Sequence, residues 1–345
     1  MAPLIGYYAH HHGSGHLTRA RLVAAAYPGR VDIASSQTAE GVSVRLPPDT
    51  DGAKTVDATA NGLLHWAPRH SDLLGPRAQA LLEWIAATRP ALVVVDVSVE
   101  VALLLRLAGV PVVVVRQHGD RRDQPHLLAY RLAEVMLAPY PSWCEDPTFE
   151  ADLQAKTFHS GGFSRFDGRS RPAVPRDREE VLVVVGTGGT RLDAPTIERL
   201  AQRSSLQWTA IGVDGADGPN LRFLGRVADP WPLLCRAGVV VTSAGHNALC
   251  EAAAADAPTV AVAETRPFDE QRHKVSVLAG AGAVQSAPPL DEPASWDRLL
   301  RTTASSRPRW RDFVDGDGCV RAASQLAARA TALERAQAPP ERKAS

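Results

Sequence analysis

The segment from Val239 to Ala255 carries the groups best suited to chemistry. An apolar run ends in a turn of small residues, Ser243-Ala244-Gly245, and an alanine-rich stretch of helical character follows it. At the N-terminus of a helix, free backbone N–H groups and the positive end of the helix dipole attract phosphate. The turn is therefore a candidate diphosphate site, which would be formed by Ser243, Gly245, His246 and Asn247.

Acidic and amide side chains after this turn could bind hydroxyl groups. Glu251 lies one turn into the expected helix, where its carboxylate can accept two hydrogen bonds from a ribose diol. Asp269, Glu270 and Gln271 form a later polar cluster that could read sugar hydroxyls. Because serine and glycine are also ordinary turn and cap residues, the turn taken alone fits a purely structural role equally well.

The segment His10–His16, with the sequence HHHGSGH, is the second chemical signal. Imidazole is a common metal ligand, but adjacent histidines on a strand point in different directions, so we expect no metal here. A purification tag is a second interpretation, which the apolar surroundings of the run disfavour. In the third, a strand edge and a glycine turn direct His16 into a cleft between domains, and Gly13, Ser14 and Gly15 form a loop on the acceptor side.

Four features follow one another along the chain: the small-residue turn, Glu251, Pro258 and the segment Pro267–Gln271. Their order resembles the C-terminal donor-binding signature of GT-B glycosyltransferases. The pattern is most similar to family 28, which includes the N-acetylglucosaminyltransferase that makes lipid II. The first loop resembles the glycine-rich loop that opens that family, and its histidine corresponds to His16. The resemblance implies an α/β fold of two Rossmann-like parallel-sheet domains that face each other across a cleft.

The resemblance also implies a partner for His16. In related UDP-dependent small-molecule glycosyltransferases, an aspartate at the end of a mid-domain strand pairs with the histidine, and Asp96 follows Val93-Val94-Val95 in this way. A carboxylate there would fix the tautomer of an imidazole that removes the proton of an acceptor hydroxyl. In the alternative interpretation, Asp96 caps the helix that starts near Val99, and His16 only binds an anion or caps its loop.

Further donor contacts follow from the same resemblance. The glycine turn Gly186–Thr190 is similar to the loop that begins the donor domain, which implies contacts to the diphosphate or sugar from Thr187, Gly188 and Thr190. Arg226 and Val227 lie where the relatives hold the edge of uracil. Glu270 replaces the first of two glutamines that are frequent in the lipid II-forming family, and this departure leaves the donor sugar open.

The elements that must position these residues alternate between strand and helix. A chain of 345 residues exceeds the usual limit of one core, and alternating strands and helices predict parallel sheets with right-handed crossovers. We expect an N-terminal acceptor-binding domain at 1–163, a linker at 164–179, a nucleotide-sugar domain with a terminal helix at 180–336, and a disordered tail at 337–345. The expected strands are 4–9, 31–34, 91–95 and 112–115 in the first domain, and 181–185, 208–212, 221–224, 239–242, 259–263 and 283–284 in the second.

Composition limits the partners and the location. Lys+Arg and Asp+Glu both number 38, so the overall charge does not indicate a nucleic acid partner. The four cysteines form no CxxC pair, which disfavours structural zinc and a disulfide scaffold and favours a reducing cytoplasm. We expect neither a signal peptide nor a membrane-spanning helix, because charges interrupt the apolar segment 92–115. Contact with the inner face of a membrane stays open.

These observations predict an inverting, metal-independent transfer of a sugar from a nucleotide donor, with UDP as the expected nucleotide, to a hydroxyl acceptor. The acceptor could be a small molecule, a glycan or a lipid-linked molecule. The choice stays open because the loops 57–72 and 116–126 carry no pattern that identifies it. No cofactor is expected beyond the donor substrate. Two alternatives keep the fold: a UDP-sugar 2-epimerase, and a nucleotide-sugar-binding protein without catalysis.

Overall fold

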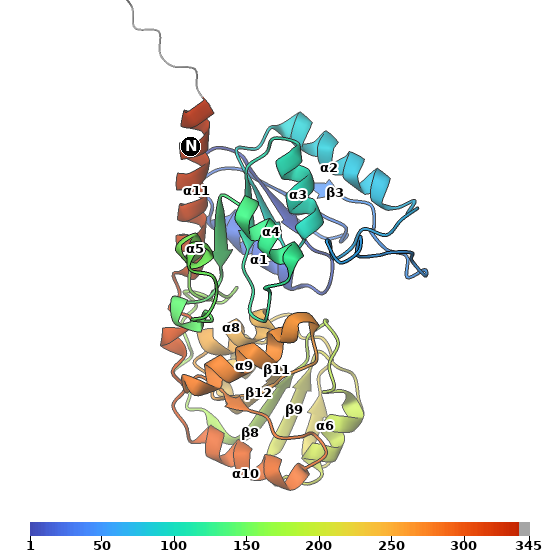
Figure 1. Ribbon diagram of the computed structural model, residues 1–345. Coiled ribbons are helices and arrows are strands. Elements are labelled where there is room, and N and C mark those ends of the chain that lie inside the picture. The colour runs from blue at the N-terminus through green and yellow to red at the C-terminus, as the bar shows by residue number, and fades with distance from the viewer. Residues whose placement is uncertain (338–345) are drawn as a thin grey trace, which may run out of the picture.

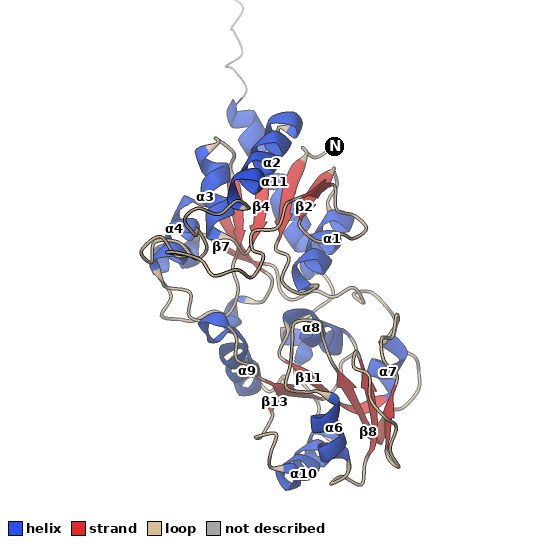
Figure 2. Ribbon diagram, turned by 90° about the vertical axis from the view of Figure 1, so that its right-hand side faces the viewer, coloured by secondary structure: helices blue, strands red, loops and turns tan. Residues whose placement is uncertain are grey.

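The computed structural model describes residues 1–337, which form two α/β domains placed one above the other in Figure 1. Residues 338–345, nearly all of the tail predicted as disordered, lie outside the described part of the chain. Each domain is a parallel sheet with helices on both faces (Figure 2), as the alternating pattern predicts.

The first domain contains a seven-stranded sheet in the order β3-β2-β1-β4-β5-β6-β7. Its strands are β1 (Ile5–Ala9), β2 (Val31–Ser35), β3 (Val44–Arg45), β4 (Val93–Asp96), β5 (Val112–Val115), β6 (Val135–Ala138) and β7 (Thr157–His159). The helices of this part of the chain are α1 (Gly15–Ala26), α2 (Leu74–Thr88), α3 (Val99–Leu107), α4 (Gln124–Leu132), η1 (Ser142–Cys144) and α5 (Ala151–Ala155).

The apolar side chains of β1 divide between the two faces of this sheet. Ile5, Tyr7 and Ala9 are buried in the cluster that also contains Leu17 of α1, whereas Tyr8 is buried on the other face with Trp84 of α2. This division follows the two-residue period of a strand. β1 is therefore covered on both sides, and its carboxyl end delivers the histidine-rich loop to the edge of the sheet.

The second domain contains a six-stranded sheet in the order β10-β9-β8-β11-β12-β13. Its strands are β8 (Asp177–Val184), β9 (Gln207–Ile211), β10 (Leu221–Phe223), β11 (Ala237–Ser243), β12 (Thr259–Val262) and β13 (Gln285–Ser286). Its helices are α6 (Ala194–Ala201), α7 (Trp231–Arg236), α8 (His246–Ala254), η2 (Pro267–Asp269), α9 (Glu270–Gly280), α10 (Pro293–Ala304) and η3 (Trp310–Asp312). In both views α8 and α9 lie on the side nearest the first domain.

The terminal helix α11 (Gly318–Gln337) packs on the first domain. Grouping it with the second domain was wrong, because its apolar stripe is buried against α1 in the core of the first sheet. The buried residues of that stripe are Ala322, Ala323, Leu326 and Ala330. Helical periodicity predicts such a stripe but does not say which surface it covers.

The chain passes between the domains twice, at neighbouring positions. Phe163 is buried in the first domain and Phe166 in the second, so the first passage lies between them. Where the chain returns, the backbone N–H of Gly162 donates to the carbonyl oxygen of Phe313 at 2.9 Å. The arginines of the predicted linker bind the second domain; Arg169, for example, makes two hydrogen bonds to Asp229, at 2.8 and 2.7 Å.

Candidate active site

His16 and Asp96 meet at the carboxyl edge of the first sheet. Asp96 is the last residue of β4 and lies beside Ala9, the last residue of β1, in the parallel ladder. After the loop that follows β1, α1 begins and places His16 in its first turn. His16 Nδ1 lies 3.0 Å from Asp96 Oδ1, and the carboxylate is fully buried. The pairing implied by the resemblance is thus present as a contact.

Two further groups bind the Asp96 carboxylate. Arg19 Nη1 donates to both oxygens at 2.9 Å, and the Tyr7 hydroxyl donates to Oδ2 at 3.1 Å. Burial alone would raise the pKa of Asp96, but Arg19, His16 and Tyr7 lower it to about 2. The carboxylate is therefore ionised at neutral pH, and Arg19 offsets part of its charge. Sequence reasoning missed Arg19, although its place one turn after His16 on an expected helix was a usable signal.

The alternative role for Asp96, as the cap of the following helix, is not what the structure contains. Ser98 occupies the N-cap of α3, and its hydroxyl accepts a hydrogen bond from the backbone N–H of Val101 at 3.2 Å. The carboxylate of Asp96 instead contacts His16 and Arg19 of α1 and Tyr7 of β1. Serine before a helical run is a standard N-cap residue, so the sequence contained the information to separate the two interpretations.

The three histidines before the glycine turn stack on one another, contrary to our argument that they point apart. The strand ends at Ala9, so the two-residue alternation does not extend to His10, His11 and His12. The ring centroids of consecutive histidines lie 4.5 and 4.6 Å apart. Gln37 holds this loop, because its Nε2 donates to the carbonyl oxygens of His11 and Gly13 at 2.9 and 2.6 Å.

The predicted phosphate turn joins β11 to α8 as expected. Gly245 is the N-cap of α8 and has no side chain to cap the first turn, so that turn keeps backbone N–H groups free for an anion. Ser243 is buried at the end of β11. Burial, together with Arg19 and Lys274, lowers the pKa of His246 well below its usual value, so this ring is neutral at neutral pH.

The turn contacts the first-domain loop directly. Asn247 Nδ2 donates to the carbonyl oxygen of Gly15 at 3.3 Å. The hydroxyls of Ser14 and Thr187 lie 3.2 Å apart and link the same loop to the glycine turn after β8. His16 is adjacent to Gly15, so the structure brings the candidate base and both candidate donor loops together, although the two groups are separated by more than 170 residues of sequence.

The turn after β8 is organised by Glu264, which sequence reasoning missed. Glu264 Oε1 accepts hydrogen bonds from the Thr190 hydroxyl at 2.6 Å and from the backbone N–H of Arg191 at 2.9 Å. Arg266 Nη2 donates to the carbonyl oxygen of Gly188 at 2.7 Å. Thr190 therefore holds the loop to Glu264 of its own domain, whereas Thr187 and Gly188 lie on the side that faces the first domain.

The predicted hydroxyl-reading cluster is divided in space. Asp269 has a side chain that is 63 % exposed, while Gln271 is buried and accepts the backbone N–H of Glu264 at 2.9 Å. Glu270 pairs with Arg121 of the first domain at 3.0 Å and with Lys274 of its own helix at 3.2 Å. Asp269 precedes α9 with a left-handed backbone, and Glu270 and Gln271 are on different faces of its first turn, so the three side chains separate.

The predicted nucleoside residues differ in exposure and in their partners. Glu251 is mostly buried and pairs with Arg165 at 2.8 Å, and burial raises the pKa of its carboxyl group. Arg226 is exposed on the loop after β10, and Val227 packs on the core of the second domain. Arg165 follows the first passage between domains and was not predicted as part of the site.

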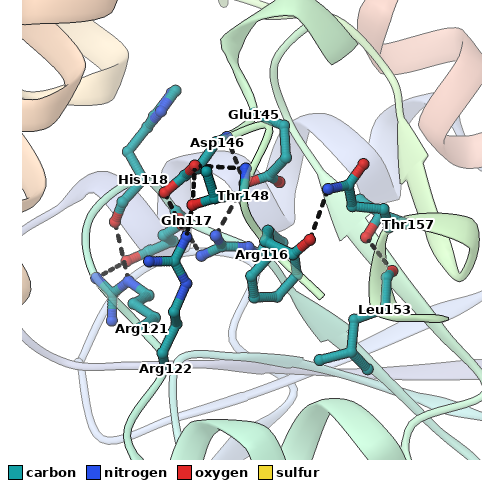
Figure 3. Close-up of polar contacts among 12 residues, drawn as sticks. Arg116, Gln117, His118, Arg121, Arg122, Glu145, Asp146, Thr148, Leu153 and Thr157 are labelled. Atoms are coloured by element: carbon teal, nitrogen blue, oxygen red, sulfur yellow. Dashed lines mark hydrogen bonds and ion pairs between the residues drawn. The ribbon is translucent and has the colours of Figure 1, made fainter. Parts of the chain in front are cut away.

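The loop from Arg116 to Asp123 carries a hydrogen-bond network that Figure 3 shows. Arg116 pairs with Glu145 at 2.9 Å, and Arg121 donates to the carbonyl oxygen of His118 at 3.0 Å and to Gln117 Oε1 at 2.9 Å. These bonds fix the Arg121 guanidinium that reaches Glu270 of the second domain. The predicted acceptor loop is thus also an interdomain contact.

Phe268 fits into this contact from the second domain. Its carbonyl oxygen accepts the backbone N–H of Asp120 at 2.8 Å, and its ring packs edge-on against His126, with centroids 4.6 Å apart. Phe268 and Asp269 both adopt left-handed backbone conformations, with φ of 62° and 51°. Gly119 has a φ of 100°, and a Cβ there would collide with the Phe268 carbonyl oxygen.

Comparison with known proteins gives no matching family model and no matching curated relative. Solved structures do match across the whole chain. MurG of Acinetobacter baumannii has a TM-score of 0.62 at 15 % identity, covering 96 % of this chain and 100 % of that one. Arabidopsis thaliana UGT89C1 complexed with UDP has a TM-score of 0.65 at 12 % identity, covering 95 % and 99 %. The rhamnosyltransferase SpnG complexed with thymidine diphosphate has a TM-score of 0.59 at 17 % identity, covering 96 % of each chain.

The chain has the GT-B fold. The matches to MurG and UGT89C1 extend over 96 % and 95 % of the chain, and so include both parallel sheets. In this GT-B chain the loops after β1, β8 and β11 meet at the domain junction, where His16, Thr187 and Asn247 lie. None of the helices described for residues 1–337 has the length and apolar character needed to cross a membrane.

Proposed function

We propose that this protein is an inverting, metal-independent glycosyltransferase that moves a sugar from a nucleoside diphosphate donor to a hydroxyl group. The observation that carries the proposal is the His16 imidazole, held at 3.0 Å by a buried Asp96 on a loop that touches the turn before α8. A similarity of the fold to glycosyltransferases supports the class of reaction. The contacts of His16 support its assignment as the base.

The proposed step is a single displacement. With its Nδ1 proton held by Asp96, His16 presents the lone pair of Nε2 to the acceptor hydroxyl and takes its proton. The acceptor oxygen forms a bond to the anomeric carbon while the bond from that carbon to the diphosphate oxygen breaks. Configuration inverts because attack and departure occur on opposite faces. The imidazolium that results is stabilised by the Asp96 carboxylate.

The leaving diphosphate would be held by the first turn of α8. Backbone N–H groups at Gly245 and beyond, with the helix dipole, favour the negative charge that develops as the sugar leaves. The neutral His246 ring adds a hydrogen bond rather than a charge. Because these groups stabilise the charge without a cation, we expect turnover to persist in EDTA.

Calorimetric titration with UDP, TDP and GDP, first without metal and then with Mg²⁺, tests the donor site. UDP and thymidine diphosphate are the ligands of the solved complexes of UGT89C1 and SpnG, and we propose UDP for this chain. Binding of UDP at about micromolar strength without metal supports the proposal. If none of the three nucleotides binds, the transferase assignment fails and only the fold stands.

The acceptor would enter from the loops 57–72 and 116–126 of the first domain. His65 of the first loop and Asp123 of the second lie 2.5 Å apart through Nε2 and Oδ2, so the two loops form one wall. We propose an acceptor of the small-molecule, glycan or lipid-linked class, used in the cytoplasm or at the inner membrane face. The four free cysteines support a reducing compartment. A screen of hydroxyl acceptors with wild-type and His16→Ala protein tests this part.

A further inference from the structure

Three imidazoles on the loop before the glycine turn form a compact cluster. The ring centroids of His10 and His12 lie 5.0 Å apart at an interplanar angle of 12°, with His11 stacked beside both. One nitrogen from each ring lies within 4.8 Å of the others. A tetrahedral zinc ion with ordinary Zn–N bonds needs nitrogens ~3.4 Å apart, so the rings must rotate to bring their nitrogens together.

An unpartnered ring nitrogen points to a ligand in this cluster. His11 Nδ1 is buried and has no hydrogen-bond partner among the described residues. The other nitrogen of the same ring, Nε2, lies 3.5 Å from Asp49 Oδ1. A carboxylate on one nitrogen keeps the proton there and leaves the lone pair of the other free, which is the arrangement behind most metal-bound histidines. An orphaned buried acceptor is otherwise destabilising.

The backbone of the loop is already held in the shape that the cluster requires. Gln37 binds the carbonyl oxygens on both sides of His12, at His11 and Gly13. The backbone N–H of His12 donates to His10 Nδ1 at 3.2 Å, and an ion at His10 breaks this exposed hydrogen bond because neutral imidazole has only one free lone pair. Gln37 thus holds the backbone, whereas the stacked rings must rotate before their nitrogens can meet at one ion.

From this geometry we infer that His10, His11 and His12 bind a divalent transition-metal ion of the zinc or nickel type, with Asp49 orienting His11. Imidazole nitrogens select such ions over Mg²⁺ and Ca²⁺, which prefer oxygen ligands. The cluster lies beside the proposed base, because the ring centroids of His10 and His16 are 5.9 Å apart, but this inference does not rest on the proposed transfer chemistry. This inference differs from our expectation that the loop binds no metal.

A second cluster of metal-ligating side chains within residues 1–337, formed by His65, Asp123 and His126, is a poorer candidate. Arg121 Nη1 lies 3.0 Å from His126 Nε2 and can only donate, so Nε2 is an acceptor and Nδ1 carries the proton that faces Asp123. A metal at Nδ1 would move that proton to Nε2, against the guanidinium. The cluster is thus satisfied as a hydrogen-bonded chain and provides a matched control.

Calorimetric titration of tag-free, metal-depleted full-length protein with Zn²⁺, Ni²⁺ and Mg²⁺ tests the site. We expect one equivalent of Zn²⁺ to bind and Mg²⁺ not to bind. His12→Gln, which changes an exposed ring, should weaken Zn²⁺ binding by about tenfold or more, and the triple variant His10→Gln/His11→Gln/His12→Gln should abolish it. His65→Gln should leave it unchanged.

Absence of Zn²⁺ binding to the wild type would overturn the proposal. So would a triple variant that binds like the wild type, or a loss of binding caused by His65→Gln, which would assign the ion to the other cluster. Circular dichroism of each metal-free variant establishes that it is folded. If the triple variant fails to fold, the visible absorption of bound Co²⁺ decides: its tetrahedral bands should be weaker in His12→Gln than in wild type, and an unchanged spectrum refutes the site.

Discussion

The buried pair of Asp96 and Arg19 makes a quantitative prediction about stability. Both side chains are almost fully enclosed, at 0 % and 5 % exposure, and Arg19 Nη1 contacts both carboxylate oxygens at 2.9 Å. Removing one partner leaves the other charge buried and unpaired, which costs about 3–5 kcal/mol. We predict that Asp96→Asn and Arg19→Met each lower the free energy of unfolding by about this amount.

The pKa of Asp96 gives a second estimate of the same quantity. Its value falls from 3.8 to about 2 in the folded protein, which corresponds to roughly 2–3 kcal/mol of stability at about 1.4 kcal/mol per unit. Because the folded pKa is depressed, this contribution is complete above the unfolded pKa near 4 and is lost as the pH falls through about 2. The effect of Asp96→Asn should therefore shrink between pH 5 and pH 2.

A double-mutant cycle measures the coupling directly. Urea unfolding of wild type, both single variants and Asp96→Asn/Arg19→Met at pH 7 gives four free energies. Because the second substitution removes the charge that the first left unpaired, we expect the double variant to be about 2–3 kcal/mol more stable than the sum of the single effects predicts. Additivity within about 0.5 kcal/mol would refute the description of Asp96 and Arg19 as one buried ion pair.

Three further predictions concern catalysis, binding and the domain contact. His16→Ala should lower turnover by about 10²–10⁴-fold while calorimetry finds UDP affinity unchanged, and normal turnover would remove His16 from the role of base. Glu251→Gln should weaken UDP binding by about tenfold in the same titration. An affinity equal to that of the wild type would show that Glu251 does not contact the nucleoside. Gly119→Ala should lower the free energy of unfolding, measured by thermal unfolding, by about 1–3 kcal/mol. The new Cβ would collide with the Phe268 carbonyl oxygen, and alanine is disfavoured at the positive φ of this position. Gly168→Ala, with a φ of 74° in open space, is its control and should cost less; equal losses would show that Phe268 does not restrain position 119.

The sequence predicted the parallel architecture and the turn before α8 because these depend on local patterns. Four consecutive valines in β5 and the run into Ser243 have the length, apolar character and turn residues that mark buried strands. The segment from Gln124 to His159, which forms α4, β6, α5 and β7, received no assignment. α4 has a proline in its first turn, and β7 has only three residues, none of them fully buried, so neither stands out from its neighbours.

Contacts between distant residues were the part that the sequence did not contain. Arg19 approaches Asp96 across 77 positions and Arg165 approaches Glu251 across 86, and no periodic pattern links such pairs. The His16–Asp96 contact was reached only through the resemblance to known glycosyltransferases. The direction of the three histidine rings was misjudged because the end of β1 at Ala9 decides it, and boundaries of elements are weakly encoded.

The return of α11 makes the second domain an insertion within the first. The inserted segment runs from about residue 163 to 314. The chain leaves the first domain and returns to it at Gly162 and Val314, which are paired by an isolated β-bridge. Its two ends are therefore neighbours, so a short connection could close the host without it, and the same segment could be exchanged as one cassette. Recombination between proteins of this architecture would then replace the second domain in a single event while the first domain keeps both β1 and α11.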